Sequence, residues 1–139
     1  MSQYFEAGEE TVWNPSNGVG LLFIRSSEAL ALAVDAPTGI TASGADEWVI
    51  DMPVFEKFVG ELVSRYQQST HLILRSLMEG FIATSLVLIE RGGGSVPLPS
   101  TEPCPDAFDV QVSSDGLAPR ADPGRLEELR IAHSKAMPI

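Results

Sequence analysis

The chain has 139 residues, which fits one domain, and its 44% hydrophobic content is enough for a real core. Nineteen acidic and nine basic residues give a net charge of −10. This charge repels phosphate backbones and anionic membrane surfaces. We therefore expect neither nucleic acid nor a membrane as a partner.

Cysteine use and the first residues indicate a cytoplasmic protein. The one cysteine, Cys104, has no second cysteine with which to form an internal disulfide, and this fits a reducing compartment. The first residues, MSQYFEAGEE, lack the basic and apolar regions of a secretory signal peptide. A cytoplasmic location is the expectation.

A small β-hairpin is the first expected element, over residues 3–13. Residues with high strand propensity lie on both sides of Gly8. Tyr4 and Trp13 belong to the apolar side of this hairpin. Trp13 is more typical of a core residue than of a ligand-stacking residue, because most tryptophans simply bury surface.

Residues 14–16 are typical of a helix start, with Asn14 as the capping acceptor and Pro15 at the first helical position. A helix over residues 19–34 would follow. The alternative is a turn at Asn-Gly that leads into a strand over residues 19–24. The expected apolar face of the helix contains Leu22, Phe23, Leu30, Ala33 and Val34.

The next stretch predicts a loop of small residues over 38–46 and a short third strand over 47–50, beside the hairpin. Asp51 is the expected cap of an amphipathic helix that tolerates Pro53 in its first turn. Its two apolar rows, at helical spacing, are Val54, Phe58, Leu62 and Tyr66, and Phe55, Val59 and Val63.

A third, more apolar helix is expected over residues 69–91. From Leu72 to Ile89 the apolar residues have helical spacing, and the last two turns are apolar on nearly every side. Such a helix must be covered all round, either by its own chain or by a second copy. Residues 66–70 form either a tight turn, which gives an antiparallel helical hairpin, or part of one continuous helix about 60 Å long.

The glycines at 92–94 end this helix. Its longest uncharged run, from Gly80 to Ile89, is shorter than the roughly 20 apolar residues of a membrane span. The chain after it is rich in proline and glycine, so we expect a core domain over residues 1–96 and a flexible acidic tail over 97–139. The tail includes a short strand over 107–112 and a weak helix over 123–136.

These elements predict a mainly α (α+β) fold. It would be a helical hairpin or bundle of about three helices with a small N-terminal β-hairpin or short antiparallel sheet, followed by the flexible tail.

Polar residues at spacing four are the main candidates for chemistry. His71, Arg75 and Glu79 form the polar stripe of the most apolar helix. In a pocket, Arg75 would bind a carboxylate, His71 would move a proton and Glu79 would orient them. An i,i+4 ion pair at the protein surface explains the same residues and is the stronger interpretation.

A second candidate site has aromatic walls, made by Tyr4, Trp13 and Tyr66. No HxxxH, HExxH, CxxC, GxSxG or phosphate-loop motif is present, so neither a metal nor a cofactor is expected. The carboxylates of Asp46, Glu47 and Asp51 are more typical of helix caps and solvated surface than of a site.

Three segments resemble an uncharacterised family of small actinobacterial proteins: VWNPSNGVG, FEKFVGELVSRY and LRSLMEGFIATSLVLIERGGG. The resemblance covers about Gln3 to Val96. Because this family has no established activity, the resemblance implies a bacterial, cytoplasmic setting and transfers no site.

Two functional hypotheses follow. The first is a non-enzymatic helical interaction or accessory and regulatory protein, a homodimer through the helix from Leu72 to Ile89. The alternative is a small-molecule-binding protein or cofactor-free enzyme of bacterial specialised metabolism, with the aromatic walls and the polar stripe as its pocket.

Overall fold

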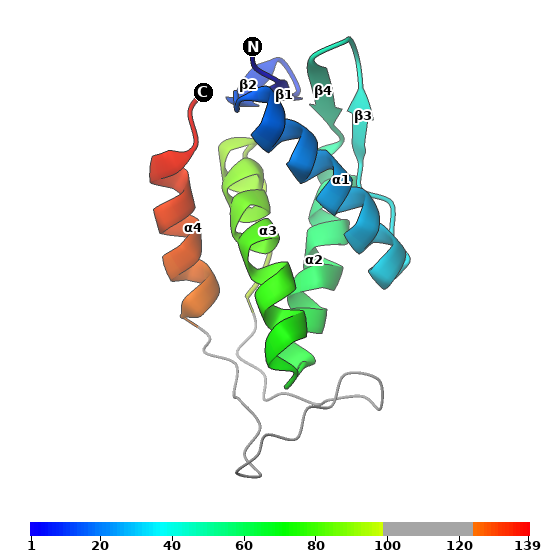
Figure 1. Ribbon diagram of the computed structural model, residues 1–139, viewed down its shortest axis with the longest axis vertical. Coiled ribbons are helices and arrows are strands. Elements are labelled where there is room, and N and C mark those ends of the chain that lie inside the picture. The colour runs from blue at the N-terminus through cyan, green and yellow to red at the C-terminus, as the bar shows by residue number, and fades with distance from the viewer. Residues whose placement is uncertain (99–123) are drawn as a thin grey trace.

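A computed structural model describes residues 1–98 and 124–139 of the chain. These residues form four helices and a four-stranded sheet (Figure 1), so the predicted mainly helical α+β class is confirmed. The elements are β1 (Tyr4–Ala7), β2 (Glu10–Trp13), α1 (Asn17–Val34), β3 (Ile40–Ala42), β4 (Glu47–Ile50), α2 (Met52–Gln68), α3 (Leu72–Arg91) and α4 (Arg125–Ala136).

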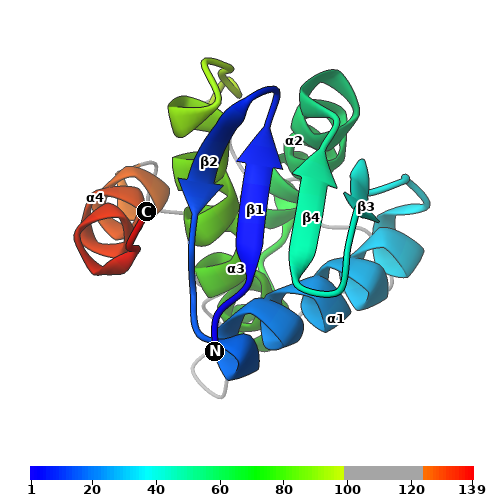
Figure 2. The same cartoon turned by 90° about the horizontal axis from the view of Figure 1, so that it is seen from above.

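The sheet lies across one end of the helices and has the strand order β2-β1-β4-β3 (Figure 2). The predicted hairpin is confirmed, with Gly8 in the left-handed region of its turn at φ 65°. The predicted third strand is β4, but it pairs with β1 in parallel, so the sheet is mixed rather than antiparallel. The loop predicted over 38–46 is wrong in part, because it contains β3.

Gln3 joins the sheet to the helical layer. Its side-chain amide donates hydrogen bonds to Asn17 (2.8 Å) and to Asp46 (3.1 Å), and its carbonyl oxygen accepts one from the indole of Trp48 (2.7 Å). One buried amide thereby fixes the start of α1 against the strands. Asp46 acts here as a structural acceptor.

The predicted helix after the hairpin is confirmed as α1, and the alternative strand over 19–24 is wrong. The cap is Ser16 rather than Asn14, so Pro15 precedes the helix instead of opening it. The buried face contains Phe23 and Ile24, whereas Leu22, predicted to be on the apolar face, is 67% exposed. The helix ends at Asp35, which has a left-handed backbone conformation.

Helices α2 and α3 form an antiparallel hairpin, so the continuous-helix alternative is wrong. No glycine or proline makes the turn. Instead, the Ser69 hydroxyl accepts a hydrogen bond from the backbone of His71 (3.0 Å), and the His71 ring accepts one from the backbone of Leu74 (3.4 Å). His71 therefore caps α3, rather than Ser69 or Thr70.

The core lies between the sheet, α2 and α3. Phe55, Phe58 and Leu62 of α2 are fully buried, as the predicted apolar rows require. Asp51 occupies the cap position of α2, although its side chain makes no capping hydrogen bond. The glycines end α3 as predicted, with Gly93 at φ 82°.

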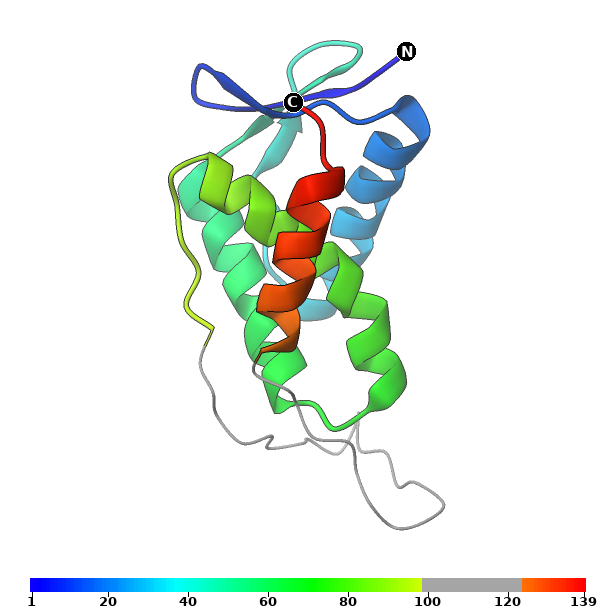
Figure 3. The ribbon, with the colours of Figure 1, turned by 90° about the vertical axis from the view of Figure 1, so that its left-hand side faces the viewer.

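Helix α4 packs along α3 (Figure 3). Its position agrees with the helix predicted over 123–136, and Leu126 is fully buried against the body of the fold. The predicted boundary at residue 96 therefore separates two segments that pack together. Cys104 and the strand predicted over 107–112 lie outside the described residues.

Candidate functional site

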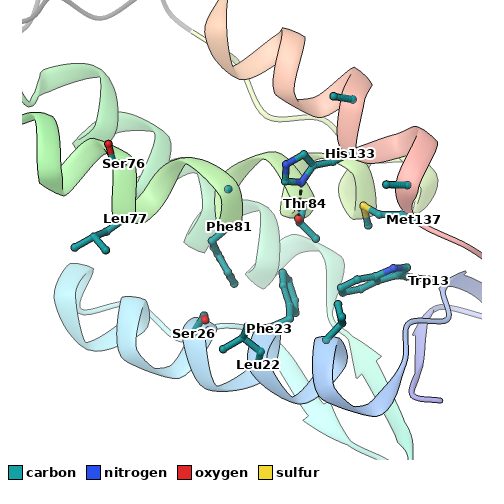
Figure 4. Close-up of a pocket in the computed structure, with 14 residues that line it drawn as sticks. Trp13, Leu22, Phe23, Ser26, Ser76, Leu77, Phe81, Thr84, His133 and Met137 are labelled. Carbon is teal, nitrogen blue, oxygen red and sulfur yellow. Dashed lines mark hydrogen bonds between the residues drawn. The ribbon is translucent and has the colours of Figure 1, made fainter. Parts of the chain in front are cut away.

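Helix α1 crosses α3, and along the long axis of the molecule the two helices run in opposite senses (Figure 1). The first half of α1 lines a hollow of about 550 Å³ together with the middle of α3 and with α4 (Figure 4). The second half of α1 lines another hollow, of about 370 Å³, with the start of α3. Leu77 lines both hollows and stands between them. We call this surface of α1 and α3, with its two hollows, the α1–α3 face.

Aromatic rings form the base of the larger hollow. Phe23 of α1 stacks on Phe81 of α3, with ring centroids 4.7 Å apart and planes 16° apart. Trp13 meets Phe23 edge-on at 5.3 Å. Trp13 is buried, as expected for a core residue, although its edge lines the hollow. These contacts hold the base rigidly, because three different elements supply the rings.

One polar pair lies in the larger hollow. The His133 ring of α4 shares a 2.8 Å hydrogen bond with the Thr84 hydroxyl of α3, as Figure 4 shows. Which group donates depends on the imidazole tautomer. None of the described residues that line this hollow is a carboxylate, so none of them can orient His133 as the acid of a hydrolytic triad does.

The predicted polar stripe does not form one site. His71 lines the smaller hollow, whereas Arg75 and Glu79 line neither. The Arg75 guanidinium is buried and lies 4.8 Å from the centre of the Tyr66 ring, in a cation–π contact. Glu79 accepts hydrogen bonds from the Tyr66 hydroxyl (2.7 Å) and from Arg125 (2.8 Å).

Electrostatics in this cluster favour a structural role. Burial, together with the hydrogen bond to the Glu79 carboxylate and its charge, raises the pKa of Tyr66 to about 12, although the nearby Arg75 lowers it. Burial alone would raise the pKa of Glu79, but the hydrogen bonds from Arg125 and Tyr66 outweigh it and keep the pKa below its usual value. The carboxylate therefore stays charged at neutral pH and links α2, α3 and α4.

The predicted aromatic walls lie apart. Tyr4 is partly exposed on β1, Trp13 borders the larger hollow and Tyr66 is in the core. The Thr84–His133 pair was not predicted, because it joins residues 49 positions apart. Among the described residues, no group of three or more histidine, cysteine, aspartate or glutamate side chains is placed to hold a metal ion.

Large apolar side chains remain exposed on the α1–α3 face. Leu22 of α1 is 67% exposed and Leu77 of α3 is 75% exposed, and Val19 and Ile73 are about half exposed. The second half of α3, in contrast, is covered by its own chain. The apolar excess predicted for the helix from Leu72 to Ile89 is thus uncovered only in the first half.

Helix α1 is the less buried of the two. Both α1 and α3 have the length and composition of a membrane-crossing helix, a property that core helices share. Only 22% of the apolar window of α1 is buried, against 56% for α3. Helix α1 is therefore the main source of uncovered apolar surface among the described elements.

Comparisons with curated proteins and with solved structures find no match. The model of one family, described as a family of unknown function (DUF6086), matches residues 1–139. This match extends beyond the stretch from Gln3 to Val96 in which the sequence resemblance was recognised, and it includes α4. The chain belongs to this family of unknown function.

Proposed function

We propose that this chain is a non-enzymatic interaction protein, of an accessory or regulatory kind, which binds an apolar helical surface on its α1–α3 face. The observation that carries the proposal is the pair of exposed leucines, Leu22 and Leu77, on two adjacent helices. Contiguous apolar surface of this kind marks interaction sites in soluble proteins.

The energetics support a partner rather than solvent on this face. Covering an exposed leucine side chain contributes roughly 1.5–3 kcal/mol. Both leucines project from helices that are held against each other beside them by the stacked rings of Phe23 and Phe81. The face is therefore preorganised, and little conformational entropy is lost when a partner binds.

Site-specific photo-crosslinking tests this proposal. A photoreactive residue at position 22 or 77 should form crosslinks to a protein in cells that produce the chain. Position 32 is the control, because Leu32 lies on the same helix and is 86% exposed but lines neither hollow. Crosslinks to lipid alone, or equal protein crosslinks at all three positions, would contradict the proposal.

A second candidate function, small-molecule binding, is favoured by the larger hollow. Its volume of about 550 Å³ is in the range of ligand pockets, roughly 300–1,000 Å³. Its aromatic base and the Thr84–His133 pair would suit a neutral ring with one hydrogen-bonding group. Thermal-shift screening with such compounds tests it. A hit counts only if Thr84→Val and His133→Gln both abolish it.

The cellular setting is part of the proposal. The sequence resemblance supports an actinobacterial, cytoplasmic protein, and the single Cys104 is compatible with a reducing compartment. Cell fractionation tests the location: recovery of the chain in the membrane or secreted fraction would contradict it.

A further inference from the structure

We propose that the partner on the α1–α3 face is a second copy of this chain, packed about a two-fold axis with α3 antiparallel to α3 and α1 antiparallel to α1. This inference rests on the proposed function, since it names the partner for the same face. Four observations carry it: residue spacing, side-chain size, the open space at Gly80, and charge.

Both helices carry a coiled-coil spacing on this face. On α3 the stripe is Ile73, Leu77, Gly80 and Thr84, with intervals of four, three and four residues. On α1 the stripe is Val19, Leu22, Ser26, Ala29 and Ala33, with intervals of three and four. Alternation of three and four residues is the spacing of a seam between two helices.

Side-chain size in the α3 stripe is complementary to its own reverse. The large residues are in the first half of the stripe and the small residues in the second. When two copies of α3 run antiparallel and cross between Leu77 and Gly80, Leu77 lies over the partner's Gly80. In the same register Ile73 lies over the partner's Thr84. Each large side chain therefore faces a small one, as an isologous interface requires.

The α1 stripe has the same order, with large residues first and small residues second. Antiparallel pairing sets Leu22 against the partner's Ala29 and Val19 near the partner's Ala33. Ser26, the middle of this stripe, lines the larger hollow together with Leu77 and Gly80, the middle of the α3 stripe.

Gly80 borders open space in a single copy. None of the described residues lies within 4 Å of a Cβ atom added there. A glycine in the middle of a helix costs about 1 kcal/mol relative to alanine. Close approach of a second helix gives this glycine a use, because the missing side chain leaves room for the partner's Leu77.

Charge and size are both compatible with a second copy. Two chains of net charge −10 repel each other, and this repulsion is smallest where the contact surface has no acidic group; both stripes are uncharged. Two adjacent helices about 27 Å long and 10 Å wide offer about 500 Å² per copy. The pair then buries about 1,000 Å², the lower limit for a specific interface.

Light scattering coupled to size exclusion, on the full chain, tests the inference. The wild-type chain should have twice its 14.9 kDa mass at micromolar concentration. Gly80→Leu should halve that mass, because it sets leucine against leucine. The control Leu32→Arg should remain a dimer. The double variant Leu77→Ala with Gly80→Leu should restore the dimer, because it again sets a large side chain against a small one.

The outcomes separate this inference from the proposed function. If the wild-type chain is a monomer but positions 22 and 77 still form crosslinks to another protein, the partner is not a second copy of this chain. The proposed function is then retained. A monomer that forms no protein crosslinks overturns both. A dimer that survives Gly80→Leu, or a folded double variant that stays monomeric, overturns the proposed register; circular dichroism establishes that each variant is folded.

Discussion

The hydroxyl of Tyr66 donates a 2.7 Å hydrogen bond to one oxygen of Glu79, and Arg125 pairs with the other oxygen of the same carboxylate at 2.8 Å. Tyr66 is fully buried in α2, whereas Arg125 is largely exposed at the start of α4. Glu79 is therefore one of the groups that hold α4 against the core, together with Thr84 and Arg91. Two of our predictions concern the ionisation of Tyr66 and of Glu79.

The first prediction concerns the tyrosine. In a Tyr4→Phe background Tyr66 is the one remaining tyrosine, and its ultraviolet absorbance should report a pKa of about 12. A raised pKa means that the neutral phenol stabilises the fold. This stabilising contribution is complete at pH values below 10.0, the pKa of tyrosine in the unfolded chain. It is lost as the pH rises through about 12, the pKa in the folded chain. Glu79→Gln should lower the midpoint, because it removes the carboxylate's charge. A titration midpoint near pH 10 for Tyr66 would contradict its hydrogen bond to Glu79.

The second prediction concerns the carboxylate in acid. The pKa of Glu79 is lowered, so its stabilising contribution is present above the unfolded value of 4.5 and is lost as the pH falls through the folded value. The melting temperature of the wild-type chain should fall more steeply below pH 4.5 than that of Glu79→Gln. Glu9→Gln is the matched control, since Glu9 is exposed in the turn between β1 and β2. Parallel curves for all three proteins would contradict the prediction.

The third prediction concerns Arg91 at the end of α3. Its guanidinium donates to the backbone carbonyls of Val12, Ser134 and Met137, at 2.9–3.1 Å. A lysine cannot reproduce this fork of donors. Because a hydrogen bond to a charged group contributes roughly 1.5–3 kcal/mol, Arg91→Lys should lower the free energy of unfolding by at least about 2 kcal/mol in urea. Arg25→Lys, at an exposed site, should change it little.

Sequence reasoning predicted the elements whose side chains repeat at a clear period. The two apolar rows of α2 are confirmed, since Phe58 and Leu62 recur every four residues and both are fully buried. The face of α1 could not be predicted in the same way. This helix is apolar on most sides, so its periodicity does not determine which side the core covers, and Leu22 was placed inward instead of outward.

Long-range contacts explain what sequence reasoning missed. The apolar residues of α3 were interpreted as a surface for a second copy, but α4 covers part of that surface from beyond residue 123. Helix α4 gives little sequence signal, because Leu126 is its one buried residue. The Thr84–His133 pair depends on this docking and therefore has no local signal either. Strand β3 is three residues long, too short for a visible alternation.

The fourth prediction concerns α4. A chain shortened to end at residue 98 should melt more than about 5 °C lower than the full chain, because it loses the buried Leu126 and uncovers a side of α3. The flexible tail expected from the sequence over residues 97–139 would imply the opposite, because removal of such a tail would leave the core domain intact. Leu126→Ala in the full chain should cost about 2–5 kcal/mol. Ile131→Ala, at a 45% exposed site on the same helix, is the control and should cost much less.

The fifth prediction concerns two glycines that should respond to alanine with opposite signs. Gly39 has φ 77°, and an added Cβ would lie 2.9 Å from the backbone oxygen of Asp51 and 2.9 Å from the backbone nitrogen of Phe55. Left-handed geometry alone costs roughly 1–2 kcal/mol with a side chain, and backbone atoms cannot move aside easily, so Gly39→Ala should lower the melting temperature markedly.

Gly60 lies inside α2, where an added Cβ would meet nothing within 4 Å. Gly60→Ala should therefore stabilise the fold by up to about 1 kcal/mol. Thermal melts of both variants measure the two signs, and a stabilised Gly39→Ala would show that the turn before β3 differs from the one described.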